Sequence, residues 1–413
     1  MSRKVLLICY YFPPLGLGGV GRPLNLFKKL PDYGWDCHIL TVKPVAYRAY
    51  EPELLDTLDK SRIHRSGSHD PQRLLYLLGV RQVKAATISK GRSVSEKFFP
   101  DSKVGWVKPA IRLGRRLCKK HRYDLLLSTS PPISSHLVGL QLKKEFQIPW
   151  IADFRDYWTA HKIEDSYSDA EAVSRAKRLL DSIGQETTAI TAVNGTVADY
   201  CGKAKVITNG YDSDLANDWK SPPGTDRFTI GLLGHQHDTR EIEPLLKLLC
   251  ALRDHNPKQF NSIRLLQVGQ MDEGWFRQLL CDHGLELDTD LRGRQGRRDT
   301  IRILSQSHLF YMGVPTEGGD VFLPGRTFDF LASGRPLLVY ASPQSEISRF
   351  FANIDRAFCF EDGQMDQAVA FIRDRIVSFH DGDYVFEPLS EFARRYSSDA
   401  MARKFASLMD RIS

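Results

Sequence analysis

The sequence predicts an α/β protein made of two doubly wound domains, each a mostly parallel sheet with helices on both faces. In both halves of the 413-residue chain, apolar runs of strand length alternate with segments of helical character, which is typical of doubly wound sheets. Runs such as Val5–Cys9 and Leu337–Tyr340 are continuously apolar, as expected of strands buried on both faces. The loop-forming residues Ser221–Asp226 separate the two halves.

The first half of the chain is expected to fold as a domain over residues 1–212. A first strand leads through a glycine-rich loop into a helix, and further strands and helices follow after the segment 44–70, which is polar and irregular. We expect strands at 4–10, 36–42, 124–128, 148–152 and 189–193, and helices at 23–30, 106–120, 136–146, 171–185 and 197–201.

The second half is expected to comprise a linker at 213–227, a domain at 228–388 and a closing helix within 389–413. Gly334 suits the left-handed position just after a helix at 326–332, and Pro336 cannot continue that helix. We expect strands at 228–233, 263–268, 309–314, 337–340 and 358–361, and helices at 241–253, 275–283, 326–332, 365–379 and 390–411.

The composition predicts a globular protein of the cytoplasm. Charged residues make up 26% and hydrophobic residues 42% of the chain, which is ordinary for globular domains. The sequence contains no run of 18 apolar residues, so no membrane-spanning helix is expected. The apolar run after Met1–Lys4 is too short for a signal peptide. Seven scattered cysteines without a C-x-x-C pair indicate reduced thiols rather than disulfides or a zinc site.

The positive charge of the chain is concentrated in its first half. Between Arg73 and Arg122 there are 14 Lys or Arg residues and only two acids, so this basic zone suits an anionic partner. The segment 106–120 interleaves cations with apolar residues, as in a helix that rests on anionic lipid; a helix packed on the sheet with a solvated basic face explains the pattern equally well. We expect an anionic membrane surface as a partner of residues 73–122, and no nucleic acid, because no nucleic-acid-binding motif is present.

A glycine-rich loop follows the first strand and matches G-x-G-x-x-G over Gly16–Gly21. A dehydrogenase is disfavoured, because the loop starts seven residues after Cys9 and the next strand runs into Lys43 instead of an acid. We expect the backbone N–H groups of Gly18 and Gly19 to face a phosphate at the start of the following helix. The alternative is a flexible connection between strand and helix.

Charged residues follow the strand expected at 148–152. Asp153, Arg155 and Asp156 come at its carboxyl end, where open α/β sheets bind their ligands. Asp153 or Asp156 is expected to hold a sugar hydroxyl or to assist an acceptor, and Arg155 to contact substrate. The alternative is a structural ion pair between Arg155 and Asp156.

The helix expected at 326–332 begins after Pro324 and Gly325, and its start is a potential anion site. Arg326 in the first turn is unfavourable to the helix dipole, a cost that a bound phosphate would offset. We expect phosphate contacts from Gly325, Arg326 and Thr327. Asp329, one turn later, is positioned to accept hydrogen bonds from a sugar or ribose diol. The alternative is an ordinary helix with solvated Arg326 and Asp329.

These motifs resemble those of retaining GT-B glycosyltransferases of family 4, most specifically over 124–158 and 321–340. The family pattern PGK-x-x-E-Y-x-A-x-G-x-P corresponds to the segment from Pro324 to Pro336, with Arg326 in place of Lys and Asp329 in place of Glu. The first acid of the family's E-x7-E pair would fall at Val321, so the resemblance implies that either Glu317 or Asp320 serves instead.

The resemblance extends to other parts of the chain. The family carries G-R-x4-K-G after the first strand of its second domain, which implies diphosphate contacts by His235 and Arg240. The segment that ends in Asp153 and Asp156 occupies the place where many relatives have a His that contacts the donor sugar. In the family, the last helix returns to brace the first domain, and the two Rossmann-like domains face a cleft.

The resemblance implies a hexosyltransferase that moves a sugar, with retention, from a nucleotide-diphosphate sugar to a saccharide or lipid-linked saccharide in cell-envelope polysaccharide synthesis. Asp153, Asp156, Arg240 and Arg326 are the expected catalytic residues. No metal or other cofactor is expected, because cations and helix ends would stabilise the departing diphosphate. The enzyme is expected in the cytoplasm, or peripherally on the inner face of the plasma membrane. Alternatives are a sugar-nucleotide epimerase on the same fold and a non-catalytic basic module that binds lipid or nucleic acid.

Overall fold

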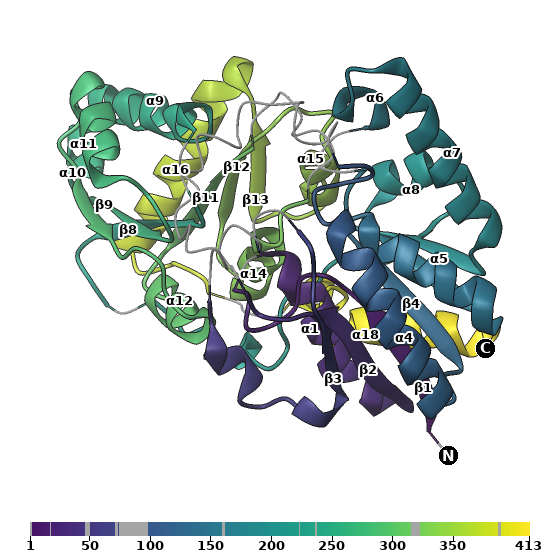
Figure 1. Cartoon of the computed structure of the whole chain (residues 1–413). Coiled ribbons are helices and arrows are strands. Elements are labelled where there is room, and N and C mark those ends of the chain that lie inside the picture. Colours follow the sequence, from purple (N-terminus) through teal and green to yellow (C-terminus); the bar gives the residue numbers. More distant parts are fainter. Residues whose placement is uncertain are drawn as a thin grey trace. The chain divides into compact units, whose positions relative to one another are not determined.

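The chain divides into two compact units. The computed structural model describes residues 2–16, 18–45, 50–70, 73, 98–158, 162–222, 224–235, 238–314, 323–386 and 390–413. The first unit comprises Met1–Gly210 and Ser398–Ser413, and the second comprises Tyr211–Ser397 (Figure 1). The chain therefore leaves the first unit after Gly210 and re-enters it at Ser398.

The first unit contains a seven-stranded, wholly parallel sheet in the order β3-β2-β1-β4-β5-β6-β7. The order reverses between β1 and β4, so a topological switch point lies there, where such sheets bind ligands. The strands are β1 (Arg3–Ile8), β2 (Trp35–Val42), β3 (Ile63–Ser66), β4 (Leu125–Ser130), β5 (Trp150–Phe154), β6 (Ala189–Ala192) and β7 (Lys205–Val206).

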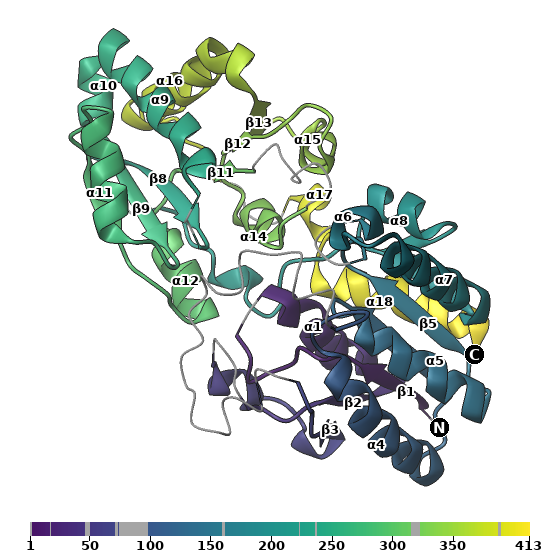
Figure 2. The ribbon, with the colours of Figure 1, turned by 45° about the horizontal axis from the view of Figure 1, so that its top comes forward.

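Helices cover both faces of this sheet. On one face α1 packs against α18, which places Met401, Phe405 and Met409 in the same core as the strands, and Figure 2 shows α18 alongside α1. On the other face α4 packs against α5 and the strands, through Ala110, Gly114 and Leu117. The helices are α1 (Gly21–Lys29), α4 (Val107–Lys120), α5 (Ser134–Phe146), α6 (Ile163–Ser166), α7 (Ala170–Glu186), α8 (Gly195–Cys201) and α18 (Ser398–Ile412).

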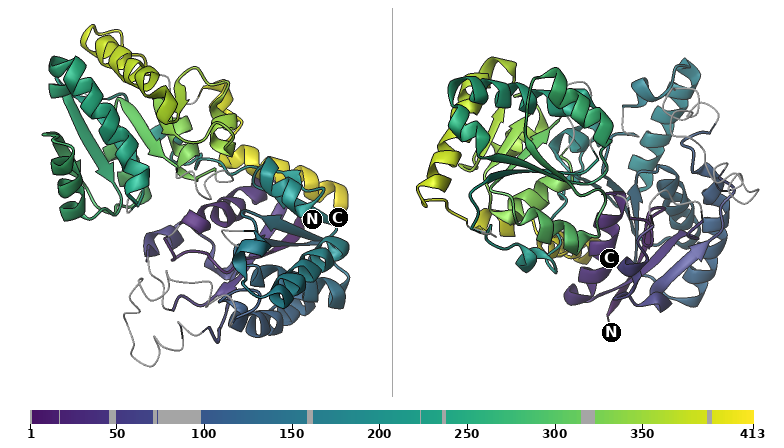
Figure 3. Two further views of the ribbon diagram at one scale, coloured as in Figure 1. Left: turned by 90° about the horizontal axis from the view of Figure 1, so that it is seen from above. Right: turned by 90° about the vertical axis from the view of Figure 1, so that its left-hand side faces the viewer.

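The second unit contains a six-stranded parallel sheet in the order β10-β9-β8-β11-β12-β13, with its switch point between β8 and β11. Apolar clusters on its two faces bury helices against it (Figure 3). The strands are β8 (Phe228–Leu233), β9 (Ile263–Val268), β10 (Asp288–Leu291), β11 (Leu309–Gly313), β12 (Leu337–Tyr340) and β13 (Ala357–Phe360). The helices are α9 (Thr239–His255), α10 (Pro257–Asn261), α11 (Glu273–Asp282), α12 (Arg297–Leu304), α14 (Arg326–Ser333), α15 (Glu346–Phe351), α16 (Met365–His380) and α17 (Glu391–Arg394).

The expected fold class, two parallel sheets with helices, is confirmed. Gly334 ends α14 in the left-handed conformation, with φ of 69°, as predicted. The expected final helix is divided into α17 and α18. The segment expected as a linker contributes Ala216 and Trp219 to the core of the second unit. In the described parts of the chain, no helix combines the length and the apolarity needed to cross a bilayer.

Candidate functional site

In the first unit, the predicted residues gather where β1, β4 and β5 end. The glycine loop passes through a 3₁₀ turn at Gly18–Val20 into α1. Arg155, just after β5, donates from Nε to the carbonyl of Ser130 (2.8 Å), and its two other nitrogens donate to the carbonyls of Pro131 and Gly19. The guanidinium therefore ties the glycine loop to the turn after β4. Burial lowers the pKa of Arg155.

Asp156 lies beside this clamp and is the carboxyl of the first unit best suited to proton transfer. The nitrogens of Arg155 donate to backbone carbonyls, and the charge of Arg155 acts on Asp156 without a hydrogen bond between the two among the described contacts. Burial raises the pKa of Asp156 to about 6, although the positive charge of Arg155 opposes the rise. A carboxyl with this pKa changes its protonation state close to neutral pH.

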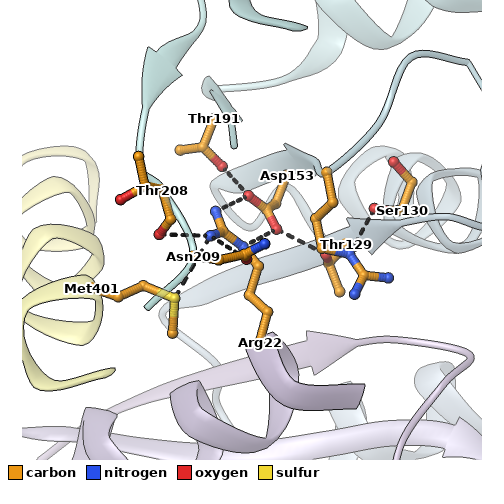
Figure 4. Close-up of polar contacts among 9 residues, drawn as sticks. Arg22, Thr129, Ser130, Asp153, Thr191, Thr208, Asn209 and Met401 are labelled. Carbon is orange, nitrogen blue, oxygen red and sulfur yellow. Dashed lines mark hydrogen bonds and ion pairs between the residues drawn. The ribbon is translucent and has the colours of Figure 1, made fainter. Parts of the chain in front are cut away.

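Asp153 was predicted to lie beyond the end of the strand. It lies inside β5 instead, and its side chain is fully buried (Figure 4). It pairs in register with Thr129 of β4 and Thr191 of β6, and both hydroxyls donate to it, at 2.8 and 2.7 Å. Arg22 of α1 donates to both carboxylate oxygens, at 2.9 and 2.7 Å. Burial alone would raise the pKa of Asp153, but Arg22 and the hydroxyls hold it below its usual value. Each of its carboxylate oxygens therefore accepts two hydrogen bonds from the protein.

In the second unit, Arg326 lies at the carboxyl ends of β8 and β11, which are the strands of the switch point. Its guanidinium donates to the carbonyls of Leu233 (2.9 Å) and Gly313 (3.3 Å) and lies 3.8 Å from Glu241 of α9. Its Nε–H is buried and finds no acceptor among the described residues. Burial lowers the pKa of Arg326, against the attraction of Glu241.

The start of α14 has the character expected of an anion site. Gly325 is exposed, and no side chain caps the helix within the described residues. Thr327 is fully buried and its backbone N–H donates to the carbonyl of Pro324, at 2.9 Å, so the predicted phosphate contact of this residue is not available in this structure. Asp329 is partly exposed, and burial raises its pKa to about 6, with Arg297 lowering and Asp212 raising it.

His235 and Arg240 follow β8 but differ in their surroundings. His235 pairs through Nδ1 with the carbonyl of Gln270, at 3.1 Å. The Arg240 side chain is 58% exposed and forms an ion pair, at 2.7 Å, with Asp238, the residue that caps α9. Glu317 and Asp320, one of which was expected as the first acid of the pair with Asp329, lie outside the described residues.

The structure thus groups the predicted residues within each unit: Gly18, Gly19, Asp153, Arg155 and Asp156 in the first, and His235, Arg240, Gly325, Arg326, Thr327 and Asp329 in the second. Two partners were not predicted, Arg22 and Glu241. A signal for Arg22 was available in the sequence: it stands in the first turn of α1, where a cation is unfavourable to the helix dipole. Arg326 stands in the first turn of α14 in the same way.

Comparisons with solved structures match the whole chain at low sequence identity. Sucrose-phosphate synthase from Thermosynechococcus elongatus superposes with a TM-score of 0.65, at 13% identity, over 99% of this chain and 98% of that one. HepE of Anabaena, in complex with UDP-glucose, superposes with a TM-score of 0.63 at 13% identity, over 99% of this chain and 99% of that one. WaaG, a glycosyltransferase involved in lipopolysaccharide biosynthesis, has a TM-score of 0.58 at 12% identity, over 98% of this chain and 99% of that one. No protein-family model matches the chain, and no curated protein matches it by sequence.

These similarities establish the fold. The chain has the GT-B fold, with two Rossmann-like domains, each built on a parallel sheet. Fold alone does not specify a reaction; the reaction depends on the residues at the strand ends of each unit.

Proposed function

We propose that this protein is a glycosyltransferase that moves a sugar from a nucleotide-diphosphate sugar, with retention, to a saccharide or lipid-linked saccharide acceptor. The observation that carries the proposal is Arg326, held by the carbonyls of Leu233 and Gly313 at the switch point of the second sheet. The similarity to HepE, which is bound to UDP-glucose, supports a nucleotide sugar as the ligand of this fold.

The second unit would supply the charge that the leaving diphosphate requires. Negative charge grows on the diphosphate as the sugar departs, and donors fixed in advance stabilise it without reorganisation. Arg326 is fixed by two strand ends, and the start of α14 next to it has no side-chain cap among the described residues. Arg240 is largely exposed and can exchange its partner Asp238 for a phosphate. In this proposal Asp329, with either Glu317 or Asp320, holds sugar or ribose hydroxyls.

The first unit would supply the glycine loop and one titratable carboxyl. The N–H groups of Gly18 and Gly19 begin the turn that leads into α1, and Arg155 fixes that turn. Asp156, with a pKa of about 6, is ionised at neutral pH and able to accept a hydrogen bond or a proton from the acceptor hydroxyl. Asp153 is assigned no contact with substrate.

The basic zone is proposed to hold the enzyme at an anionic membrane surface, where a lipid-linked acceptor would be found. Most of this zone lies outside the described residues, but α4 lies within them. Its buried residues pack on the sheet, and Lys108, Arg112, Arg116, Lys119 and Lys120 are exposed. Because the apolar side of α4 is used by the fold, we expect electrostatic contact with lipid headgroups rather than insertion.

The test is a thermal-shift series with UDP, GDP, dTDP and their sugars, followed by turnover with the donor that binds. We expect one base to raise the melting temperature of the wild type and Arg326→Ala to abolish the shift. Arg277→Ala serves as the control, because Arg277 is exposed and pairs only with Glu273 of α11 in the described structure.

Three outcomes would contradict the proposal. Absence of any nucleotide shift together with vesicle binding would favour a non-catalytic lipid-binding module. Formation of an isomerised sugar nucleotide without acceptor would favour an epimerase. An equal shift in wild type and Arg326→Ala would remove the assigned diphosphate contact.

A further inference from the structure

Arg22 contacts four separate parts of the first unit (Figure 4). Besides its two bonds to Asp153, it donates from Nη1 to the carbonyl of Thr208 (3.1 Å), to Oδ1 of Asn209 (3.3 Å) and to Sδ of Met401 (3.6 Å). Its guanidinium also lies 5.0 Å from the ring centre of Phe405. One side chain thus joins α1, the inner strand β5, the segment Thr208–Asn209 and α18.

Two of these parts are the places where the chain leaves and re-enters the first unit. We call Thr208–Gly210 the outgoing passage and Ser398–Met401 the returning passage, because the units divide after Gly210 and before Ser398. Just beyond both passages, in the second unit, the N–H of Tyr211 donates to the carbonyl of Tyr396 (3.0 Å). Nη1 of Arg22 therefore reaches both passages within a few residues of the point where they run side by side.

Stability alone does not account for this arrangement. The Arg22 and Asp153 side chains are 2% and 0% exposed, and desolvation of such a pair offsets much of its attraction, so apolar residues of the same volume would serve stability as well. Arg22 is also a cation in the first turn of α1, which the helix dipole disfavours. The pair does provide a fixed geometry, because both guanidinium nitrogens on one edge bond to both carboxylate oxygens.

We propose that Arg22 is a positioning residue, held by Asp153, that fixes the glycine loop at the start of α1 to both interdomain passages. Displacement of either passage then moves the loop, and a ligand held by the loop restrains the passages. The ligand part of this inference rests on the proposed function, in which the Gly18–Gly19 loop binds the diphosphate. The link between loop and passages stands on the contacts of Arg22 alone.

The test compares Arg22→Lys and Asp153→Asn with Ser128→Ala. Lys keeps the charge beside Asp153 but cannot reach both carboxylate oxygens and the passages at once. Asn keeps the shape of Asp153 and removes its charge. Ser128 is a matched control: it is buried in β4 between His136 and the indole of Trp150 (2.8 Å to each) and bonds to neither passage.

The first measurement is amide hydrogen exchange of the ligand-free full chain. We expect exchange over 208–212 and 396–403 to be about ten-fold faster in Arg22→Lys and Asp153→Asn than in the wild type, the scale for loss of a hydrogen bond to a charged group. Ser128→Ala should leave these segments unchanged while it speeds exchange in α5. Unchanged passages in both variants, or equal acceleration in Ser128→Ala, would overturn the proposal.

The second measurement adds whichever of UDP, GDP or dTDP stabilises the wild type. We expect the nucleotide to slow exchange in both passages of the wild type and to lose that effect in Arg22→Lys; protection that persists in the variant would overturn the coupling. If no nucleotide binds the wild type while the ligand-free exchange changes as expected, the proposed function fails and the link between loop and passages remains supported.

Discussion

Replacement of Arg326 by Ala is expected to reduce turnover by ~100-fold, the scale for loss of one donor to a developing negative charge. The structure indicates that the same change also weakens the fold. Two guanidinium-to-carbonyl bonds disappear, of 2.9 and 3.3 Å, and Glu241, whose side chain is only 14% exposed, loses the cation 3.8 Å away.

The expected loss of stability can be estimated from these contacts. A hydrogen bond to a charged group contributes about 1.5–3 kcal/mol, and the bond of 3.3 Å belongs at the weak end of that range. Loss of the attraction between Arg326 and the partly buried Glu241 adds to the cost. We therefore expect Arg326→Ala to lower the free energy of unfolding by about 3–5 kcal/mol, a large part of the 5–15 kcal/mol typical of a folded protein.

A double variant separates the two effects. Arg326→Ala combined with Glu241→Gln also removes the buried negative charge that Arg326 attracts, so the double variant should recover part of the unfolding free energy, measured by urea denaturation. Turnover, measured as release of nucleoside diphosphate below the melting temperature of every variant, should stay ~100-fold low, because the diphosphate still lacks its donor. Full recovery of turnover in the double variant would refute the assignment and make Arg326 a purely structural residue.

Three further outcomes are expected. Asp156→Asn should lower turnover above pH 6 and remove the acid limb of the pH–rate profile. Because burial raises the pKa of Asp156 to about 6, the folded state binds its proton more tightly than the unfolded state does. The variant should therefore gain roughly 1–3 kcal/mol of stability above pH 6, measured by pH-dependent denaturation. Gly313→Ala should destabilise the second unit by more than about 3 kcal/mol in urea, because a Cβ there would lie 1.9 Å from the carbonyl oxygen of Glu241. The triple reversal Lys108→Glu, Arg112→Glu and Arg116→Glu should abolish sedimentation with anionic vesicles, at about 1 kcal/mol for each cation lost.

Each of these outcomes has a control. Asp156→Glu retains a titratable group, so its pH–rate profile should keep an acid limb. If the acid limb persists in Asp156→Asn, the titrating group is another residue. Gly363→Ala should be nearly neutral, because a Cβ at that position meets nothing within 4 Å. Neutral phosphatidylcholine vesicles should bind neither the wild type nor the triple variant, and binding of both to anionic vesicles would exclude α4 as the contact.

The expected strands that match the structure are those buried within the sheets. The predicted ranges 228–233, 263–268 and 337–340 coincide with β8, β9 and β12, because apolar residues dominate each range and most of its positions are buried. The strands that were not expected, β3, β7 and β10, lie at sheet edges and contain His64, Arg65, Lys205 and two aspartates. An edge strand has one partner and tolerates polar side chains, so its sequence carries little of the apolar signal used for prediction.

The candidate site was predictable as a set of loops but not as a set of contacts. Strand ends and helix starts follow from the local sequence, and they located Arg155, Asp156 and Arg326. What each guanidinium bonds to depends on residues far away in the chain: Arg155 bonds to Gly19, 136 residues earlier, and Arg22 to Asp153, 131 residues later.

The sequence by itself determined the two parallel sheets, the glycine loop and the start of α14, because apolar runs, glycines and prolines act through local backbone conformation and burial. Only the tertiary structure decided which charged residues are free to meet a ligand. Asp153 and Asp156 are three residues apart and have the same chemistry, yet β4 and β6 surround the first with hydroxyls and α1 supplies it with Arg22. The second lies past the strand, where the charge of Arg155 offsets only part of the effect of burial and the pKa of Asp156 is raised to about 6.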